Sequence, residues 1–464
     1  MFSVNEIAVA TGGRLIGLAS GNITGISTDS RSVIPGQLFV PLRGEHFDGH
    51  TFIKEVTDKG VTAILAEENW LKGHSIPDSV AGIAVKNSLK ALGDLAAEWR
   101  NRFDMPIIGV TGSNGKTTVK EMLGSILVLT GQGLKTTGNL NNLIGVPQML
   151  FQLRPEHCWV VLEMGMSESG EIDRLASITA PRVGIVLNAL PAHLQSMGTV
   201  EAVAAAKGEL LHRISDGGLA VVNADDSRVA SLSQNPSARR ISFGIDRGEV
   251  RAGKIESLGL DGQRFQIITP HGEATVHLKA CGRHNIYNAL AATAALHETV
   301  ELATIAKGLE NFTPYKGRFQ IEQLEGITFI DDSYNANPAS TKAALETLKQ
   351  LAPEGRSIAI LGDMLELGEH EAEAHRGVGA VAGRNVDHLY LLGKRMVKYA
   401  LEGALLADMP AESVFCGKDH SEIALEVFKT MKNGDVILFK GSRGMAMEKV
   451  STELKNLMRQ PKGE

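Results

Sequence analysis

The chain has 464 residues, which is too long for one ordinary hydrophobic core and predicts about two to four domains. Hydrophobic residues make up 43% of it and charged residues 22%, both near globular averages, which argues against a largely disordered protein. Fifty glycines and only 5% aromatic residues favour an α/β protein with many tight strand-to-helix turns over a β-sandwich.

Charge, cysteine usage and the length of apolar runs indicate where the protein works. A net charge of −6 provides no general basic field, so nucleic acid is an unfavourable partner. Cys158, Cys281 and Cys416 are widely spaced without a C-x-x-C pair, which is typical of reduced thiols. The first 13 residues lack the pattern of a signal peptide, and no apolar run is long enough to cross a bilayer. We therefore expect a soluble, cytoplasmic protein without membrane insertion.

Residues 1–84 alternate short apolar runs, such as 37–42 and 61–66, with turn residues, and predict a small α/β domain. Hydroxyls, a carboxylate and a guanidinium gather in one short stretch of it, which consists of Ser27, Thr28, Asp29, Ser30 and Arg31. The stretch suits a polar loop with an Asx-type turn as well as a small-molecule site, and both interpretations stay open.

Residues 85–313 begin a second pattern of strands, glycine-rich turns and helices. Apolar runs at 105–111, 159–162 and 183–187 are expected as strands, and residues 116–129 have helical periodicity. Strand, turn, helix and strand in this order predict a parallel sheet with crossover helices.

The sharpest motif follows the first of these strands. It runs from Gly109 to Thr118 and contains Thr111, Gly112, Ser113, Asn114, Gly115, Lys116, Thr117 and Thr118. Such a loop points successive N–H groups at phosphate oxygens, with Lys116 reaching the β- and γ-phosphates and Thr117 binding Mg²⁺. Val110 departs from the strict phosphate-loop pattern, and a mere tight turn is the alternative. We nevertheless predict that a nucleoside triphosphate binds here.

Two further candidates for a metal follow strands of the same predicted sheet. The strand 158–163 ends in Glu163, and parallel sheets bind ligands at the carboxyl ends of their strands. Glu163 is therefore placed to hold Mg²⁺, with a solvated strand end as the alternative. His193 follows the next strand, where a histidine is more often structural than a ligand.

Lys207 lies on the apolar stripe of a predicted helix that spans residues 201–214. Partial burial there would lower its pKa and leave a reactive neutral amine. Such an amine could form a carbamate with CO₂, which would supply an anionic oxygen ligand to a second Mg²⁺. The chemistry alone favours a lysine whose ammonium reaches solvent past its stem.

Residues 314–464 restart the α/β pattern. Strands are expected at 327–330, 358–361, 389–392 and 436–439, with helical stretches between them. Asn337 and Pro338 are a good helix start, with asparagine as N-cap and proline at the first helical position.

In their order along the chain, these motifs resemble the Mur ligases, which add amino acids successively in bacterial peptidoglycan synthesis. The resemblance rests on ten segments: Gly109–Thr118, Gly138–Asn142, Glu163, Ala192-His193, Lys207–Glu209, Gly282–Asn285, Gly317-Arg318, Asp331–Pro338, Gly362–Gly368 and Lys440–Arg443. Within the family, Asp331–Pro338 resembles the members that join D-alanyl-D-alanine to UDP-N-acetylmuramoyl-tripeptide through an acyl phosphate, with release of ADP and phosphate.

The resemblance implies three domains: a UDP-sugar domain at 1–84, a central phosphate-loop ATPase with a parallel sheet at 85–313, and a Rossmann-like domain at 314–464. It also implies two Mg²⁺ ions, a carbamylated Lys207 and a monomer that binds ATP. Val110 is normal for this family. The implied metal ligands are Thr117, Glu163, His193 and Lys207, of which the last three, with Lys116, are catalytic. The implied nucleotide contacts beyond the loop are Asn285, Asn288, Arg318 and Asp332. The implied substrate contacts are Thr28, Asp29, Ser30, Arg31, Asn139, Asn142, Tyr334, Asn335 and Asn337.

Three rival functions are weighed against this one. Folylpolyglutamate synthetase shares the last two domains but lacks a UDP-sugar domain, so residues 1–84 argue against it. Sibling muramyl ligases that add L-amino acids are separated only by Asp331–Pro338. A non-ligating nucleotide switch of the GTPase kind would carry an Asn-Lys-x-Asp motif that reads the base, and this sequence does not contain one.

Overall fold

The computed structural model describes residues 1–17, 21–45, 47–192, 194–352 and 355–459. By its internal contacts the chain forms two compact units. The first consists of Met1–Gly109, Gln132–Gly165 and Asp173–Pro181, and the second of Val110–Gly131, Met166–Ile172 and Arg182–Glu464. The division falls inside strand β10 (Ile107–Thr111), just before the phosphate loop.

The first unit contains a five-stranded sheet in the order β2-β9-β8-β5-β4, parallel except for the β2–β9 pair. Its strands are β2 (Arg14–Ile16), β4 (Gly25–Ser27), β5 (Gln37–Phe39), β8 (Ala63–Glu67) and β9 (Ala81–Val85). Apolar clusters cover both of its faces, so β8 and β9 are buried along their whole length, as expected of parallel strands. The apolar runs at 37–42 and 61–66 thus contain β5 and most of β8, as expected of a small α/β domain.

Short strands and helices complete the first unit. The strands are β1 (Phe2–Ser3), β3 (Asn22–Ile23), β6 (Arg43–Gly44), β7 (Phe47–Asp48), β11 (Gly133–Lys135) and β12 (Trp159–Glu163). The helices are α1 (Val4–Thr11), α2 (Ile53–Asp58), α3 (Glu68–Leu71), α4 (Ser88–Arg100), α6 (Gly145–Leu150) and α7 (Glu171–Thr179). β11 and β12 pair in parallel, which places the end of β12 beside Thr136.

The second unit begins with α5 (Lys116–Leu127) and continues in a sheet whose strands run in the order β13 to β18. These strands are β13 (Val183–Val186), β14 (Leu219–Asn223), β15 (Arg239–Gly244), β16 (Val250–Ser257), β17 (Gln263–Thr269) and β18 (Gly272–Leu278). The helices are α8 (Leu194–Met197), α9 (Val200–His212), α10 (Ser227–Ala230), α11 (Arg283–Leu296) and α12 (Leu302–Asn311). The predicted strand at 183–187 and helices at 116–129 and 201–214 are confirmed.

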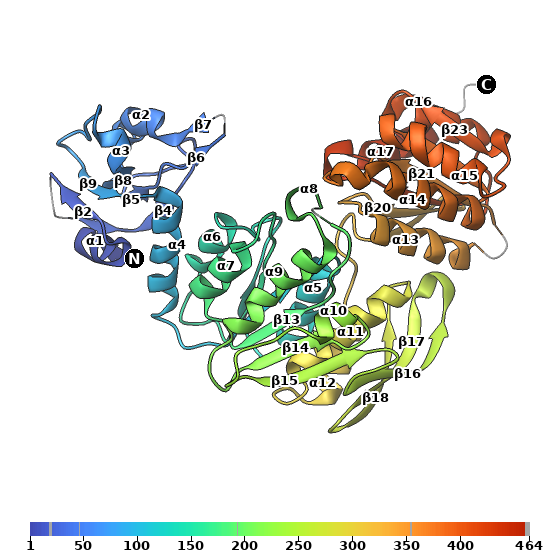
Figure 1. Ribbon diagram of the computed structural model, residues 1–464, viewed down its shortest axis with the longest axis horizontal. Coiled ribbons are helices and arrows are strands. Elements are labelled where there is room, and N and C mark those ends of the chain that lie inside the picture. Colours follow the sequence, from blue (N-terminus) through green and yellow to red (C-terminus); the bar gives the residue numbers. More distant parts are fainter. Residues whose placement is uncertain (18–20, 46, 193, 353–354, 460–464) are drawn as a thin grey trace. The chain divides into compact units, whose positions relative to one another are not determined.

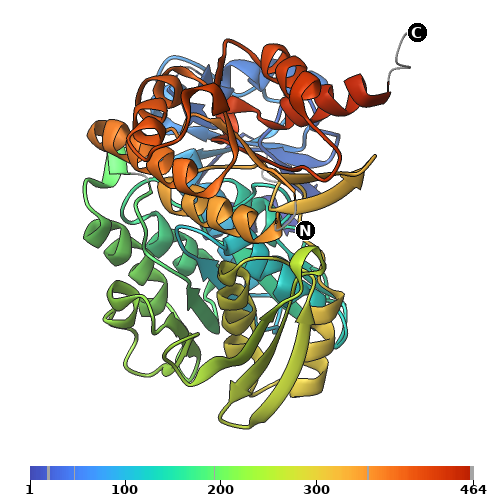
Figure 2. The same ribbon diagram turned by 90° about the vertical axis from the view of Figure 1, so that its right-hand side faces the viewer.

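The antiparallel end of this sheet differs from the expected parallel pattern. β16, β17 and β18 form an antiparallel meander, with α12 packed along β18 (Figure 2). Burial alternates along β17, which is typical of a strand with one covered face. The hairpin turns at Gly272, whose φ of +143 suits glycine. The alternation at 263–269 and this turn are the signals from which the sequence could have predicted it.

A six-stranded sheet follows in the order β19-β20-β24-β21-β22-β23, parallel except for the β19–β20 pair. The strands are β19 (Gln320–Leu324), β20 (Ile327–Asp332), β21 (Ser357–Gly362), β22 (His388–Leu392), β23 (Val414–Gly417) and β24 (Val436–Lys440). The helices are α13 (Pro338–Leu351), α14 (Glu371–Asn385), α15 (Leu401–Leu405), α16 (His420–Thr430) and α17 (Glu448–Arg459). Two separate apolar clusters cover the two faces, α13 and α14 on one side and α16 and α17 on the other (Figure 1). All four predicted strands and the Asn337 helix start are confirmed.

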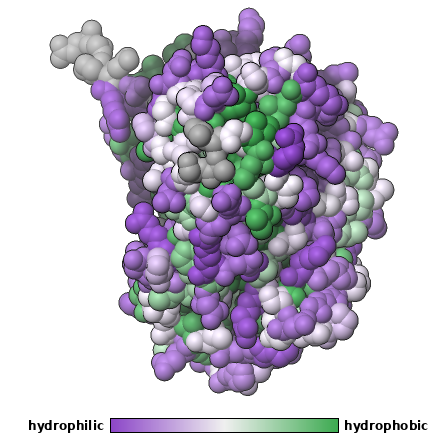
Figure 3. Space-filling model, turned by 90° about the vertical axis from the view of Figure 1, so that its left-hand side faces the viewer, coloured by the Kyte–Doolittle hydropathy of each residue, from purple (hydrophilic) through white to green (hydrophobic). Residues whose placement is uncertain are grey.

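On the face drawn in Figure 3 hydrophilic residues predominate, and hydrophobic residues gather in its upper half. In the part of the chain that the structure describes, every helix is too short or too polar to cross a membrane. Cys158, Cys281 and Cys416 are all free thiols.

His375 of α14 is hydrogen-bonded to the loop after β21. Its burial predicts how the stability of the protein depends on pH. The side chain is fully buried, its Nδ1 bonds Glu371 O at 2.6 Å, and its Nε2 accepts the N–H of Met364 at 3.0 Å. Burial lowers the pKa of His375 below its ordinary value of 6.5. The unfolded chain therefore takes up this proton first, so the free energy of unfolding decreases as the pH falls from about 6.5.

We expect His375→Gln to reduce this pH dependence, because Gln can accept from Met364 without binding a proton. The loss is at most about 1.4 kcal/mol per pH unit. Urea unfolding between about pH 7.5 and about pH 5.5 measures it, with His212→Gln, an exposed histidine, as the control. An unchanged pH slope in His375→Gln would contradict the prediction.

Candidate functional site

The phosphate loop lies between β10 and α5, where the sequence predicts it. Gly115 is the N-cap of α5 with φ +88, a left-handed conformation that glycine adopts without strain. A β-carbon there would lie 2.4 Å from Asn288 Oδ1, and one at Gly112 would lie 2.8 Å from Leu187 Cβ. Neighbouring segments thus approach the loop too closely for a side chain. Gly115 has no side chain that could cap α5, and the N-terminus of this helix carries a partial positive charge that favours an anion.

Residues after β13 fix the shape of the loop. Asn188 Oδ1 accepts the N–H of Asn114 at 2.9 Å, and Asn188 Nδ2 donates to Asn114 O at 3.1 Å. Ser113 Oγ donates to Leu190 O and accepts from Leu190 N, both at 3.0 Å. The loop is therefore preorganised by side-chain and backbone hydrogen bonds rather than by its own residues alone.

Lys116 and Thr117 occupy the positions that the motif predicts. Lys116 Nζ donates to Gly112 O at 2.8 Å, so the ammonium bends back over the loop. Thr117 is buried, and its Oγ1 accepts from Arg318 Nη2 at 3.3 Å. Arg318 comes from the segment before β19, which brings a second cation to the start of α5.

A cavity of about 530 Å³ opens beside the loop, large enough for a small-molecule ligand. Its walls come from the loop, the ends of β13 and β14, the start of α11 and the segment 318–344. The predicted site residues that line it are Ser113, Asn114, Gly115, Lys116, Thr117, Thr118, Asn285, Asn288, Arg318, Asp332, Asn335 and Asn337. The structure therefore gathers most of the predicted nucleotide contacts around one cavity. Thr111 is fully buried at the end of β10, outside this lining.

Asn285 and Asn288 lie one turn apart on α11 and are both buried. Asn288 Nδ2 donates to Asn285 Oδ1 at 3.0 Å, and Asn285 Nδ2 donates to Cys281 O at 2.8 Å. These bonds hold Asn288 Oδ1 against Gly115. Burial lowers the pKa of the adjacent His284, with Asp332 acting in the opposite direction.

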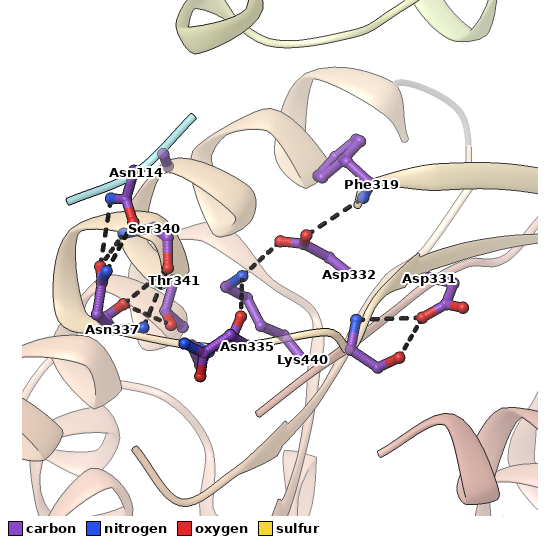
Figure 4. A network of polar contacts seen from close by, with 12 residues as sticks. Asn114, Phe319, Asp331, Asp332, Asn335, Asn337, Ser340, Thr341 and Lys440 are labelled. Atoms are coloured by element: carbon purple, nitrogen blue, oxygen red, sulfur yellow. Dashed lines mark hydrogen bonds and ion pairs between the residues drawn. The ribbon is translucent and has the colours of Figure 1, made fainter. Parts of the chain in front are cut away.

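The other wall of the cavity is a polar network after β20 (Figure 4). Asp332 forms an ion pair with Lys440 and accepts the N–H of Phe319 at 3.2 Å. Lys440 Nζ also donates to Asn335 O at 3.1 Å. The guanidinium of Arg318 lies 4.0 Å above the ring of Tyr334, a cation–π contact.

Asn337 joins this network to the phosphate loop. It caps α13 by accepting the N–H of Ser340 at 2.9 Å, and its Nδ2 donates to Asn114 Oδ1 at 2.6 Å. Asn114 Nδ2 donates back to Asn337 Oδ1 at 3.3 Å (Figure 4). A predicted nucleotide contact and a predicted acceptor contact are thus hydrogen-bonded to each other.

Lys207 is buried on α9, with 2% of the residue exposed. The interpretation in which its ammonium reaches solvent is therefore wrong. Burial lowers the pKa of Lys207 well below its usual value, and the positive charge of Lys116 lowers it further. The amine is neutral more readily than an ordinary lysine, as carbamate formation requires.

Glu163 lies in the first unit at the end of β12 and is 3% exposed, so it is not a solvated strand end. Its Oε1 accepts from Asn141 Nδ2 at 2.9 Å, and its N–H donates to Thr136 Oγ1. Asn142 Oδ1 accepts the N–H of Gly145, the first residue of α6, at 2.8 Å, while Asn139 is exposed. His193 lies outside the described residues.

The stretch Thr28–Arg31 follows β4 in the first unit. Asp29 Oδ1 accepts the N–H of Arg31 at 2.9 Å, which confirms the Asx-type turn. The Arg31 guanidinium lowers the pKa of Asp29 to about 2. Ser30 is buried, and its carbonyl accepts from Lys59. Thr28 Oγ1 accepts from Gln148 Nε2 of α6 at 3.1 Å, so this loop and the segment after Asn142 adjoin.

Comparison with known proteins identifies the family to which this chain belongs. Three family models match along the chain: "Mur ligase family, catalytic domain" at 22–100, "Mur ligase middle domain" at 110–296 and "Mur ligase, glutamate ligase domain" at 317–443. A UDP-N-acetylmuramoyl-tripeptide–D-alanyl-D-alanine ligase of Bacillus subtilis is 35% identical over 93% of both chains. The chain belongs to the Mur ligase family.

Solved Mur ligases share the fold over nearly the whole chain. MurF from Acinetobacter baumannii superposes with a TM-score of 0.89 at 36% identity and covers 98% of this chain and 99% of its own. The MurF ligase of Thermotoga maritima in complex with ADP gives a TM-score of 0.81 at 29% identity, over 93% and 97% of the two chains. The α/β class and the resemblance to this family are therefore confirmed.

Three polar residues that hold predicted site residues escaped the prediction of individual contacts. Asn188 holds the phosphate loop, Lys440 holds Asp332, and Asn141 holds Glu163. Asn141 and Lys440 stood within motifs that carried the resemblance, and Asn188 closes a predicted strand. Their roles depend on partners distant in sequence, and only the contacts in the folded chain identify them.

Gly115 provides a test of the cavity. We expect Gly115→Ala to weaken ADP binding by about tenfold or more, because its β-carbon would meet Asn288 and strain the loop. Calorimetric titration with ADP measures the affinity. Gly73→Ala, where a β-carbon meets nothing within 4 Å, is the matched control. Equal ADP affinity in Gly115→Ala and the wild type would exclude the loop as the phosphate site.

Proposed function

We propose that this chain is an ATP-dependent ligase that joins D-alanyl-D-alanine to UDP-N-acetylmuramoyl-tripeptide, in the cytoplasm and as a monomer. The observation that carries the proposal is the 35% identity to a ligase of that name over 93% of both chains. Free cysteines and the use of ATP suit the cytoplasm.

The proposed reaction begins with two anions that must approach each other. The substrate carboxylate attacks the γ-phosphate of ATP, which forms an acyl phosphate and releases ADP. Lys116 and the N–H groups at the start of α5 stabilise the charge of the phosphates, and the rigid loop holds them in line. The amine of the dipeptide then attacks the acyl carbon, an amide bond forms, and phosphate leaves.

The residues present suit magnesium, which prefers oxygen ligands and usually takes few carboxylates from the protein. We propose the Thr117 hydroxyl and the Glu163 carboxylate as ligands of one ion, and His193 and Lys207 as ligands of a second. Bound magnesium would neutralise the phosphate charge. Among the described residues no cluster of three or more His, Cys, Asp or Glu side chains forms a metal site, so hydroxyl and substrate oxygens would complete the coordination.

A carbamate on Lys207 is part of this proposal. The neutral amine attacks CO₂, an N–C bond forms and one proton leaves to solvent. The product is an anion beside Lys116, so the repulsion that lowers the Lys207 pKa becomes attraction. The proposed physical reason for carbamylation is thus the burial of Lys207 near the positive charge of Lys116.

The domain boundaries at 84/85 and 313/314 also remain proposals. The six-stranded sheet lies wholly within 314–464, and the five-stranded sheet ends with β9 at Val85. Tyr334, Asn335 and Asn337 are proposed for the dipeptide side, and Thr28 to Arg31, Asn139 and Asn142 for the UDP-muramoyl side. A family model that matches at 22–100 supports a sugar-binding first domain over a folylpolyglutamate synthetase.

Phosphate release tests the function directly. With ATP, Mg²⁺ and UDP-N-acetylmuramoyl-tripeptide, we expect release to depend on D-alanyl-D-alanine and to be far slower with single amino acids. Lys116→Ala should lower the rate by about a hundredfold or more, because the phosphate charge loses its cation. Lys449→Ala, an exposed lysine on α17, is the control. Release that ignores the acceptor would favour a nucleotide switch and overturn the proposal.

Lys207 has a separate test. We expect Lys207→Ala to lose activity by roughly a hundredfold and to regain part of it with acetate or propionate, which can occupy the place of the carbamate. Lys116→Ala is the matched control, because an anion cannot replace its ammonium. If short carboxylates rescue neither variant, Lys207 carries no carbamate that matters to the reaction.

A further inference from the structure

Lys440 is a buried cation at the centre of the cavity wall and has no role in the scheme above. It ends β24, one of the two central strands of the six-stranded sheet, and only 2% of it is exposed. A buried ammonium costs several kcal/mol unless it is paired and hydrogen-bonded. The contacts that compensate this cost therefore indicate what Lys440 does.

The sheet register places Lys440 beside Asp332. The two residues are partners in the parallel pairing of β20 with β24, so their side chains lie on the same face at the carboxyl ends of both strands. Tight packing fixes this strand end, because a β-carbon on Gly441 would lie 2.6 Å from Met447 Cγ and 3.1 Å from Gly362 Cα. The ammonium consequently has little freedom to move.

The two partners of Lys440 belong to different halves of the proposed site. Asp332 is the proposed nucleotide-side carboxylate, and its other oxygen accepts the N–H of Phe319, next to Arg318. Asn335 accepts from Lys440 through its carbonyl at 3.1 Å and lies in the loop that leads to Asn337. Asp332, Asn335 and Lys440 all line the same cavity.

A second contact from the same strand end holds the same loop. Ser442 Oγ donates to Ala336 O at 3.3 Å and accepts the N–H of Leu365 at 2.8 Å. Two consecutive carbonyls, of Asn335 and Ala336, are thus fixed by Lys440, the last residue of β24, and by Ser442 just after it. The backbone of this loop is set from Lys440 and Ser442, and Asn337 then pairs with Asn114 of the phosphate loop.

We propose that Lys440 is a positioning residue that holds the nucleotide-side carboxylate and the acceptor loop in one fixed arrangement. The proposal rests on the function proposed above and adds a residue through which the nucleotide and acceptor halves are joined. Without the ammonium, Asp332 keeps a charge with one backbone partner, and Asn335 loses its side-chain donor. The carboxylate of Asp332 and the loop that contains Asn335 then both lose their fixed positions.

The test compares full-length wild type with Lys440→Met, Lys440→Arg and Lys455→Met. Lys455 is a matched control, because it forms an ion pair with Glu322 and packs on Phe329 of the same sheet, away from the cavity lining. We expect Lys440→Met to weaken ADP binding and to raise the KM for D-alanyl-D-alanine, each by about tenfold or more. Lys440→Arg should recover part of both losses, and Lys455→Met should change neither.

Comparison with Lys455→Met separates a positioning role of Lys440 from a loss of stability alone. If Lys440→Met and Lys455→Met change the ADP affinity and the KM equally, or Lys440→Met changes neither quantity, the proposal is overturned. ADP titration needs no acceptor, so it decides the role of Lys440 even if wild-type turnover with D-alanyl-D-alanine fails. That failure would count against the proposed function alone.

Discussion

The close approach of α11 to the phosphate loop is the constraint on which the second unit depends. Asn288 Oδ1 would lie 2.4 Å from a β-carbon at Gly115, so the loop and the helix can pack only around a glycine. The same residue supplies the left-handed turn that starts α5 and aims its N–H groups outward. Gly115 thus leaves room for Asn288, adopts the left-handed backbone conformation and starts the helix that can bind an anion.

Hydrogen bonds from three other segments complete the loop. Asn188 holds it from the end of β13, Asn337 from the start of α13 and Arg318 from the segment before β19. All three side chains come from positions just after or before a strand, where the carboxyl ends of parallel strands gather ligands. Because these hydrogen bonds already fix the loop, its donors need little rearrangement when phosphates bind. Donors that are fixed in advance make the largest contribution to electrostatic catalysis.

Local pattern was enough to predict the elements that carry the site. The strands at 107–111, 159–163 and 183–186 and the N-cap at Asn337 follow from apolar runs and capping chemistry, which are properties of neighbouring residues. The antiparallel β17–β18 hairpin departs from the predicted parallel pattern, because strands with one covered face alternate in burial and pair through a short turn. Partners such as Asn188 with Asn114 or Lys440 with Asp332 are 74 and 108 residues apart, and no local signal encodes such pairs.

Two of the buried lysines of the second unit, Lys207 and Lys440, show how the environment of a lysine decides its chemistry. Lys440 faces the carboxylate of Asp332, so its charge is compensated and the ammonium serves as a fixed hydrogen-bond donor. Lys207 faces the positive charge of Lys116 and pairs with no acid among the ion pairs of the described residues, so burial and repulsion both favour its neutral amine. A neutral amine is a nucleophile, whereas a paired ammonium is not. The sequence patterns of the two residues, a lysine on an apolar stripe and a lysine ending an apolar strand, look alike. Their difference arises from the sign of the nearest charge, which only the folded chain supplies.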